Sequence, residues 1–223
     1  MSDLRLVIFD VDGTLVDSQD EIWAAMRDAF AAVGLPMPAR AAVLGIVGLS
    51  LAQAFAQLAS DQTGAVQAAL VDAYKSSFAA RRRATAKGQG SPLYPGARAA
   101  LDQLQAQDHT LLALATGKSR RGLVGLIEAH DLHGLFASQH CADDHPSKPN
   151  PSMVLACLRD TGVAAQRAIM VGDTCFDMDM ARAASVATIG VTWGYHSADS
   201  LNADHILTDF ADLPGVIDMI LEQ

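Results

Sequence analysis

Residues 6–18 read LVIFDVDGTLVDS. The stretch starts with four apolar residues, which is typical of a short strand buried on both faces of a parallel sheet. The apolar run ends at Asp10, and Asp12 follows two positions later, so strand alternation sends both carboxylates the same way. Gly13 then permits a sharp departure of the backbone. Because ligands of open α/β sheets bind beyond the carboxyl ends of the strands, these carboxylates mark a candidate site.

Further apolar runs of this kind recur along the chain. They alternate with segments of helical spacing, which predicts an α/β fold with a Rossmann-like, three-layer core around a parallel sheet. Asn150 and Pro151 predict the start of one helix, and Gly162 predicts its end. The predicted strands are residues 6–9, 111–115, 168–171, 187–191 and, more weakly, 205–207, and the predicted helices are residues 97–107, 119–130, 151–161, 176–184 and 211–221.

The pattern changes between residues 19 and 91. Apolar residues there follow helical spacing, for example at Ile22, Met26 and Phe30, and no buried-strand run occurs. We predict that residues 19–91 form a small α-helical cap domain inserted after the first strand, and that residues 1–18 and 92–223 form the core. The glycines and proline at 88–92 are typical of a return linker.

The composition argues against several classes of protein. The formal net charge of −9 disfavours a nucleic-acid-binding surface. The N-terminus lacks the features of a signal peptide, and no run of about 18 apolar residues predicts a membrane span. Three cysteines without metal-type spacing indicate reduced thiols, and with them a cytoplasmic protein. An acidic protein that acts on phosphate needs a local source of positive charge, such as a metal ion or a few lysines.

The two carboxylates after the first strand suggest how that charge is supplied. Asp10 and Asp12 repel each other, and a divalent cation relieves the repulsion. Magnesium prefers oxygen ligands and commonly bridges to substrate phosphate. One carboxylate could then attack phosphorus while the other acts as acid and base. An Asp-Gly pair alone also fits a simple turn, but the complete stretch after a buried strand favours a site.

The segment DVDGTLVDS, residues 10–18, resembles motif I of the haloacid dehalogenase-like superfamily, in its phosphoglycolate phosphatase-like branch. The resemblance implies that Asp10 is the nucleophile that accepts the phosphoryl group. It implies that Asp12 is the general acid and base, and that its backbone carbonyl contacts Mg²⁺. True haloacid dehalogenases lack the second carboxylate, so the presence of Asp12 argues against dehalogenation.

Two further segments resemble the phosphate-binding motifs of the family. Thr116 and Gly117 follow the second predicted strand, where a hydroxyl and free amides at a helix start suit phosphate, and motif II implies that role for them. Lys148, in KPNP, resembles the lysine of motif III, which implies that it pairs with the nucleophile and with the phosphoryl group. Gly117-Lys118-Ser119 is not a nucleotide-binding P-loop, because Leu112 occupies the position of the required glycine.

A second acidic cluster follows the strand predicted at 168–171. Asp173 and Asp177 lie four positions apart, so an intervening helical turn brings them together. Acidic residues at a helix start also suit the helix dipole, but here they repeat the acidic strand end seen at Asp10. The segment GDTCFD resembles motif IV, which implies that Asp173 coordinates Mg²⁺ and that Asp177 supports the site. The implied metal site therefore comprises Asp10, Asp12, Asp173 and Asp177, whereas the residues at 140–145 indicate a polar loop.

The family implies a Mg²⁺-dependent phosphatase that hydrolyses a small phosphorylated metabolite, with phosphoglycolate as a first candidate. It further implies an aspartyl-phosphate at Asp10. We predict a monomer or a homodimer. An inorganic pyrophosphatase, a β-phosphoglucomutase-like mutase and a catalytically silent phosphometabolite-binding module remain alternatives. Phosphonate hydrolysis would need a cap lysine, and only Lys75 and Lys87 lie in that segment. The loop at 45–50, GIVGLS, fits a substrate loop and an interhelix turn equally well, and WGYH at 193–196 could border the site.

Overall fold

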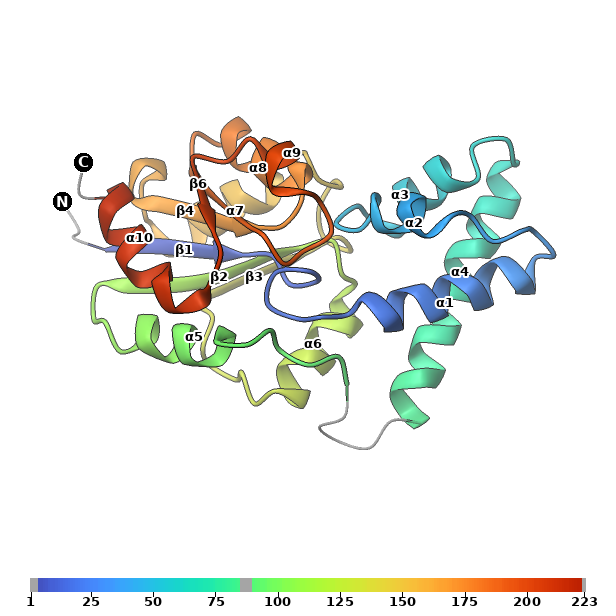
Figure 1. Ribbon diagram of the computed structural model, residues 1–223, viewed down its shortest axis with the longest axis horizontal. Helices are drawn as coiled ribbons and strands as arrows, with labels where there is room; N and C mark the ends of the chain where they lie inside the picture. The colour runs from blue at the N-terminus through green and yellow to red at the C-terminus, as the bar shows by residue number, and fades with distance from the viewer. Residues whose placement is uncertain (1–3, 85–89, 222–223) are drawn as a thin grey trace.

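The computed structural model describes residues 4–84 and 90–221. Within them, parallel strands form one sheet in the order β3-β2-β1-β4-β5-β6 (Figure 1). The order reverses between β1 and β4, which is where open α/β sheets bind ligands. The strands are β1 (Arg5–Phe9), β2 (Thr110–Thr116), β3 (Ser138–Cys141), β4 (Ala168–Gly172), β5 (Ala187–Val191) and β6 (His205–Leu207).

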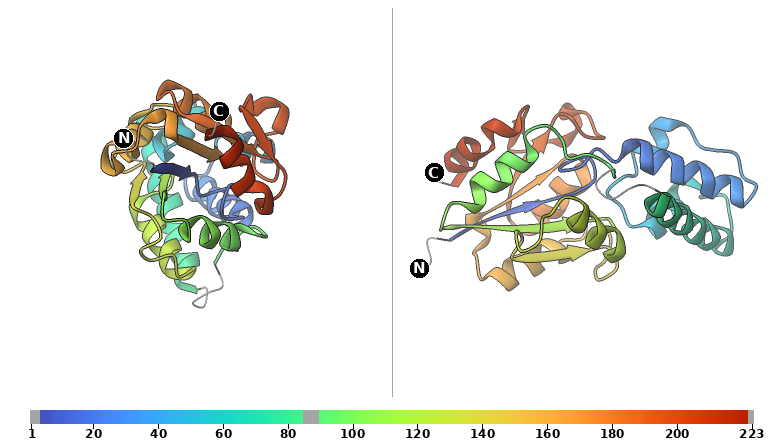
Figure 2. Two further views of the ribbon diagram at one scale, coloured as in Figure 1. Left: turned by 90° about the vertical axis from the view of Figure 1, so that its left-hand side faces the viewer. Right: turned by 90° about the horizontal axis from the view of Figure 1, so that it is seen from below.

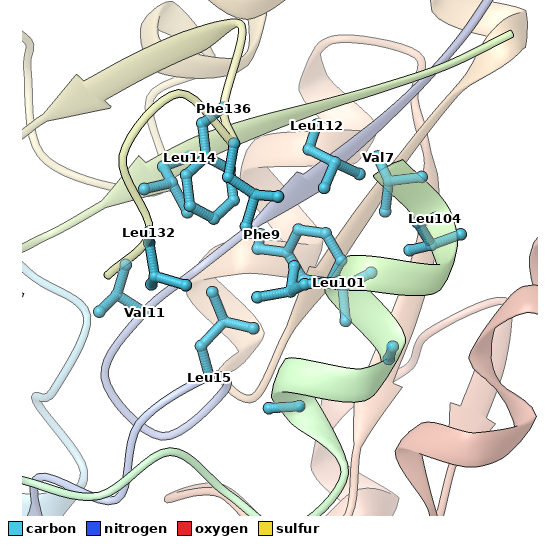
Figure 3. Close-up of a cluster of buried hydrophobic side chains, with 14 of the residues drawn as sticks. Val7, Phe9, Val11, Leu15, Leu101, Leu104, Leu112, Leu114, Leu132 and Phe136 are labelled. Carbon is cyan, nitrogen blue, oxygen red and sulfur yellow. The ribbon is translucent and has the colours of Figure 1, made fainter. Parts of the chain in front are cut away.

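Helices cover both faces of the sheet and complete a three-layer core. They are α5 (Ala97–Gln105), α6 (Arg120–Ala129), α7 (Ser152–Thr161), α8 (Cys175–Ala183), α9 (Ala198–Leu201) and α10 (Leu213–Leu221). Because strand side chains alternate, Val7 and Phe9 pack on the face covered by α5, α6 and α10, whereas Leu6 and Ile8 pack against α7 and α8. Figure 3 shows Phe9 on the first of these faces, beside leucines of α5.

The predicted α/β fold is confirmed, and the five predicted strands lie where the apolar runs placed them. β3 was not among the predicted strands, because its sequence, SQHC, contains no apolar run. β3 lies at an edge of the sheet, where a strand has only one neighbour and needs less apolar character. His140 and Cys141 therefore belong to the sheet, and the prediction of a polar loop is wrong for these two residues.

The helix predicted at 151–161 begins one residue later than expected. Its first helical residue is Ser152, and Pro151 occupies the position before the helix. Asn150 still serves the helix start, since its side-chain oxygen accepts a hydrogen bond from Ser152 N at 3.0 Å. Gly162 ends the helix with φ 69°, a left-handed conformation that favours glycine.

A bundle of helices between β1 and α5 lies at one end of the sheet (Figures 1 and 2). It contains α1 (Gln19–Ala32), α2 (Arg40–Leu44), α3 (Leu51–Leu58) and α4 (Gly64–Ala84). Met26, Phe30, Phe55 and Leu70 are buried in a separate core within this bundle. The sequence analysis did not predict α2, because a helix of five residues is too short to show a periodicity. Lys87 and the first residues of the predicted linker lie outside the described residues.

β1 begins and α10 ends at the other end of the sheet from the helical bundle (Figure 1). Arg5 of β1 is 4% exposed and donates hydrogen bonds to Asp218 of α10 at 2.5 Å, to Gln107 at 2.7 Å and to Thr110 at 2.8 Å. These bonds tie the beginning of the sheet to the last helix. Among the described helices, none combines the length and the apolar character that a membrane span requires.

Candidate active site

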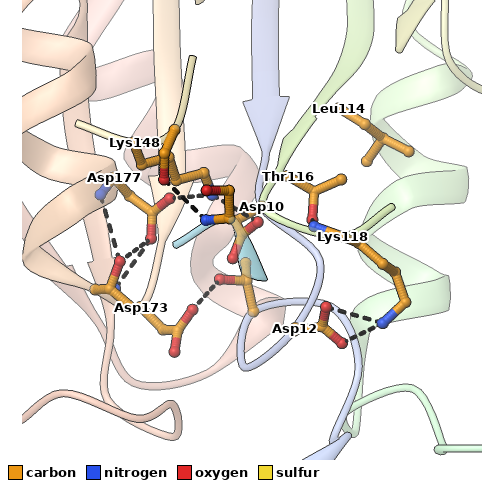
Figure 4. A network of polar contacts seen from close by, with 12 residues as sticks. Asp10, Asp12, Leu114, Thr116, Lys118, Lys148, Asp173 and Asp177 are labelled. Carbon is orange, nitrogen blue, oxygen red and sulfur yellow. Dashed lines mark hydrogen bonds and ion pairs between the residues drawn. The ribbon is translucent and has the colours of Figure 1, made fainter. Parts of the chain in front are cut away.

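Four charged side chains meet where β1 and β4 end (Figure 4). Asp10 directly follows β1, and its N–H donates to the carbonyl of Val171 in β4 at 3.0 Å. Asp173 directly follows β4, and Asp177 lies in the first turn of α8. Lys148 enters from the loop before α7. The parallel pairing of β1 with β4 therefore brings together segments that are far apart in the sequence.

Lys148 is a fully buried cation between two carboxylates. Its Nζ lies 2.7 Å from Asp10 Oδ1 and 2.6 Å from Asp177 Oδ1. Burial alone would lower the pKa of Lys148, but the two carboxylates outweigh this effect and raise the pKa. The ammonium therefore stays charged, and it is fixed where it can offset negative charge next to Asp10.

Asp10 is a buried carboxylate with few partners. Neither of its oxygens accepts a hydrogen bond of good geometry from any described residue, and its ion pair with Lys148 involves Oδ1. Burial raises the pKa of Asp10 to about 7, with the charge of Lys148 lowering it and that of Asp177 raising it. A buried carboxylate oxygen without a partner is costly, and Oδ2 has none among the described residues, so this carboxylate suits a cation or an electrophilic substrate group.

Asp10, Asp173 and Asp177 form a cluster that could hold a metal ion. One ligand oxygen of each residue lies within 4.8 Å of the others, and all three side chains are buried. Burial, and then the charges of Asp10 and Asp177, raises the pKa of Asp173 well above its ordinary value. The three carboxylates supply the oxygen ligands that Mg²⁺ prefers. The donor set and the unpartnered Oδ2 of Asp10 therefore both fit a hard divalent cation.

Hydrogen bonds fix the two carboxylates that follow β4. Asp173 accepts from Thr14 Oγ1 at 2.9 Å and from Tyr195 N at 2.8 Å. Asp177 accepts from Thr174 Oγ1 at 2.7 Å and from Thr174 N at 3.1 Å, which completes a capping box at the start of α8. Partners of this kind orient carboxylates for ligation. They also place the predicted segment 193–196 at the border of the site.

Asp12 faces a different neighbour from Asp10. Its two oxygens lie 2.6 and 2.8 Å from Lys118 Nζ, and Ser18 Oγ donates to it at 2.6 Å. The carboxylate of Asp12 lies outside the metal-type cluster found among the described residues. Any metal contact of Asp12 would therefore use its backbone carbonyl, as the motif resemblance implies. Lys118 also lies 5.3 Å from the ring centroid of Phe78 in α4, a cation–π contact with the helical bundle.

The loop at 45–50 contacts the core on the phosphate-binding side of the site. Thr116 is the buried last residue of β2, and Gly117 follows it. A Cβ atom on Gly117 would lie 2.3 Å from the carbonyl oxygen of Gly48, so only glycine allows this approach. Ser50 N donates to Ser147 Oγ in the core at 2.8 Å. These contacts favour the substrate-loop interpretation over a simple interhelix turn.

A cavity of about 270 Å³ lies between the core and the helical bundle. Asp10, Asp12, Thr116 and Gly117 line its core side, and α1, α3, α4 and the loop at 45–50 line the other side. The candidate nucleophile, the candidate acid and base and the candidate phosphate-binding residues therefore share one space. Lys148, Asp173 and Asp177 lie beside Asp10 and outside the lining of this cavity.

Two residues of the site, Lys118 and Ser18, were not identified from the sequence. Lys118 enters the motif analysis only through the rejected P-loop, although its place after Thr116 is a signal that it lies near the strand end. Ser18 closes the quoted stretch and contacts Asp12, and its Oγ lies 3.0 Å from the hydroxyl of Tyr195. These contacts depend on tertiary structure and have no spacing signature in the sequence.

The sequence profile of the haloacid dehalogenase-like hydrolases matches residues 7–191. The chain belongs to this family. Relatives of this haloacid dehalogenase-like chain include a protein named Probable phosphatase IndB from Dickeya dadantii, 37% identical over 97% of this chain and 95% of its own length. A phosphoglycolate phosphatase from Agrobacterium fabrum is 34% identical over 93% of this chain and 90% of its own length.

Solved structures show the same fold. The crystal structure of a hydrolase from Pseudomonas syringae matches 97% of this chain and 99% of its own with a TM-score of 0.84, at 23% identity. A haloacid dehalogenase-like hydrolase from Streptococcus pneumoniae matches with a TM-score of 0.82, over 97% and 99% of the two chains, at 24% identity. The motif resemblance is confirmed, and the haloacid dehalogenase-like chain is a phosphatase-type hydrolase.

Proposed function

We propose that this enzyme is a Mg²⁺-dependent phosphomonoesterase that hydrolyses a small phosphorylated metabolite through a phosphoryl group on Asp10. The observation that carries the proposal is the state of the Asp10 carboxylate. It is buried beside Lys148 and two further aspartates; its Oδ1 is paired with Lys148, and its Oδ2 has no hydrogen-bond partner among the described residues. A carboxylate in this setting is held for attack on an electrophile and is not saturated by structural contacts.

The reaction follows from the positions of the two strand-end carboxylates. A carboxylate oxygen of Asp10 attacks phosphorus, the bond to the leaving-group oxygen breaks, and Asp12 gives its proton to that oxygen. Water then gives a proton to Asp12 and attacks the phosphorus of the aspartyl-phosphate, which releases inorganic phosphate and regenerates Asp10. Lys148 offsets negative charge on the phosphoryl oxygens, and Thr116 with the amide of Gly117 binds them.

The residues that would hold Mg²⁺ are Asp10, Asp173 and Asp177, together with the backbone carbonyl of Asp12. Bound there, the ion supplies positive charge that stabilises the phosphoryl oxygens. Asp177 already pairs with Lys148 and Thr174. This engagement supports a role for Asp177 through water or as an acceptor for neighbouring ligands.

The names of relatives suggest the first substrate to assay. Several are named phosphoglycolate phosphatase, so phosphoglycolate serves as the reference compound, with pyrophosphate and sugar phosphates testing the pyrophosphatase and mutase alternatives. A silent binding module is disfavoured, because Asp10, Asp12, Lys148 and Asp173 are all present and assembled. We further propose that residues 19–91 act as the cap and that the enzyme is cytoplasmic, which its three free cysteines support.

Phosphate release by wild type, Asp10→Asn and Asp17→Asn, with and without Mg²⁺, tests the proposal. Asp17 is an exposed carboxylate of the same segment and is the matched control. We expect Mg²⁺-dependent release that falls at least ~10³-fold in Asp10→Asn and stays within about twofold in Asp17→Asn. Intact-mass measurement of quenched Asp12→Asn should show one added phosphoryl group. Unchanged turnover in Asp10→Asn would refute the nucleophile assignment.

A further inference from the structure

The cavity above Asp10 has walls that suit an apolar group. On the side of the helical bundle it is lined by Met26, Ile46, Leu49, Ala54 and Phe78. Its volume of about 270 Å³ lies near the lower end of the range for sites that hold drug-sized ligands. Glycolate places only a two-carbon acid beyond the phosphoryl group, so it would leave most of these apolar walls in contact with water.

The cations around the cavity are poorly placed for a small carboxylate leaving group. Lys118 is part of the cavity lining, but its charge is already paired with Asp12, whose two oxygens both contact its ammonium. Lys75 and Arg121 also line the cavity, but both residues are exposed to solvent. Within the described lining, the cations thus lie at the exposed rim or are already engaged.

Tyr74 is a buried polar side chain of the cavity lining that has no hydrogen-bond partner among the described residues. It is 9% exposed, it lines the cavity, and its hydroxyl makes no hydrogen bond with any described residue. Its ring is fixed by an edge contact with Phe55, with centroids 6.1 Å apart, and by stacking on Phe78 at 5.9 Å. Burial, and then the charges of Asp12 and Glu21, raises the pKa of Tyr74, so the hydroxyl stays protonated and can donate.

We propose that the substrate is a phosphomonoester whose leaving group is larger and more apolar than glycolate, and that this group offers a hydrogen-bond acceptor to Tyr74. The inference rests on the proposed function and adds a substrate class to it. The apolar part of the leaving group packs against Met26, Ile46 and Phe78. The Tyr74 hydroxyl favours those leaving groups that place a hydrogen-bond acceptor next to it. Tyr74 is thus a specificity-determining residue, and α4 and the loop at 45–50 select the substrate.

Esters of primary alcohols with similar reactivity test this class. We would compare phosphoglycolate, benzyl phosphate and the three isomeric pyridylmethyl phosphates, whose ring nitrogen adds an acceptor at different positions. Because each buried apolar carbon strengthens binding several-fold, we expect kcat/KM for benzyl phosphate to exceed that for phosphoglycolate by at least ~10-fold. At least one pyridylmethyl isomer should exceed benzyl phosphate by roughly 3- to 10-fold, as expected for one hydrogen bond.

Tyr74→Phe should remove the advantage of that pyridylmethyl isomer, mainly through KM, and leave benzyl phosphate within about twofold. Tyr94→Phe is the matched control, because Tyr94 lies outside the cavity lining and donates to the carbonyl of Trp193. Two results would overturn the inference and leave the phosphatase proposal intact. One is a kcat/KM for phosphoglycolate as high as that for benzyl phosphate. The other is an equal loss of kcat/KM for benzyl phosphate and the preferred pyridylmethyl phosphate in Tyr74→Phe. Absence of Mg²⁺-dependent hydrolysis of every ester, or hydrolysis that survives Asp10→Asn, would overturn both.

Discussion

At the scale of single residues, the site holds more negative than positive charge. Asp10, Asp173 and Asp177 share one buried space, and Lys148 is the cation that pairs with carboxylates there. Burial and mutual repulsion raise the pKa of Asp10 and of Asp173, so the charged forms of these carboxylates are unfavourable in the metal-free protein. The same carboxylates that would bind the metal ion therefore lower the stability of the metal-free protein.

Replacing Asp173 should stabilise the metal-free protein. A carboxylate whose pKa is raised by folding destabilises the fold at any pH above its unfolded-state value, and the effect disappears when the pH falls below that value. We expect Asp173→Asn to raise Tm in EDTA at neutral pH, by about 2–4 °C for each kcal/mol gained. The gain over wild type should shrink as the pH is lowered towards 4, as measured by calorimetry.

Asp28→Asn is the control for which we expect the opposite change in Tm. Hydrogen bonds from Ser77 and Arg81 lower the pKa of Asp28, so its charged form stabilises the fold above the unfolded-state pKa. This variant should lose Tm at neutral pH and approach wild type as the pH falls through the lowered pKa. A loss of Tm in Asp173→Asn at neutral pH would contradict the prediction for that residue.

Lys118 is expected to position Asp12 for proton transfer. The pair is bidentate, at 2.6 and 2.8 Å, and it fixes the direction of the carboxylate. Lys118→Met should lower kcat by about 10- to 100-fold with little change in KM, which is less than the loss of a general acid itself. Lys118→Arg can also contact both oxygens and should recover much of kcat. Equal losses in both variants, measured by steady-state kinetics, would contradict a positioning role.

At the scale of elements, the loop between α2 and α3 depends on the absence of a side chain. The carbonyl of Gly48 approaches Gly117 so closely that a Cβ atom would lie 2.3 Å from it. Ser50 N donates to Ser147 Oγ in the core, and His196 Nε2 lies 3.3 Å from the carbonyl oxygen of Gly45. These contacts, with the approach of Gly48 to Gly117, fix the distance between the apolar cavity walls and the phosphate-binding residues.

Gly117→Ala should displace the loop from the core. Because the clash is with backbone atoms, we expect KM to rise about 10-fold or more and the free energy of unfolding to fall by ~1–3 kcal/mol. Hydrogen exchange at Ser50 N–H should accelerate as its bond to Ser147 opens. Gly215→Ala is the control: a Cβ atom there meets nothing within 4 Å, so KM should not change and Tm should rise slightly. An unchanged rate of hydrogen exchange at the Ser50 N–H in Gly117→Ala would contradict the predicted displacement of the loop.

At the scale of the whole molecule, the candidate metal site joins two halves of the sheet. Its ligands come from the ends of β1 and β4, the neighbouring strands at which the strand order reverses. An ion bound there would contact segments that separate when the core unfolds. Binding of Mg²⁺ should therefore stabilise the entire core, not only a local loop.

We expect Mg²⁺ to raise Tm in proportion to its saturation of the site. At a concentration 100 times Kd the stabilisation is about 2.7 kcal/mol, which corresponds to roughly 5–11 °C for a chain of this size. Asp173→Asn should lose most of the shift, and Asp17→Asn should keep it. An equal shift in Asp173→Asn would place the stabilising ion elsewhere.

The residues at the ends of the central strands could be predicted from the sequence, but the edge strand and the contacts with the helical bundle could not. Apolar runs that end at Asp10 and Asp173 identify buried parallel strands, because burial on both faces imposes a local signal. β3 has no such signal, since an edge strand tolerates SQHC. The assembly of Asp10, Lys148 and Asp173 follows from motifs, and their chemical roles stay predictions. The partnership of Lys118 with Asp12, and that of Tyr74 with the cavity, depends on how the helical bundle and the core meet.

The hydrogen bonds of Arg5 to Asp218 and Gln107 join β1 to α10 and to the end of α5, at the end of the sheet away from the helical bundle (Figure 1). The residues that line the cavity belong to the bundle and to the part of the core that faces it. A surface linker attached beside α10 would therefore hold the enzyme on a biosensor chip or an electrode with the helical bundle directed away from the support.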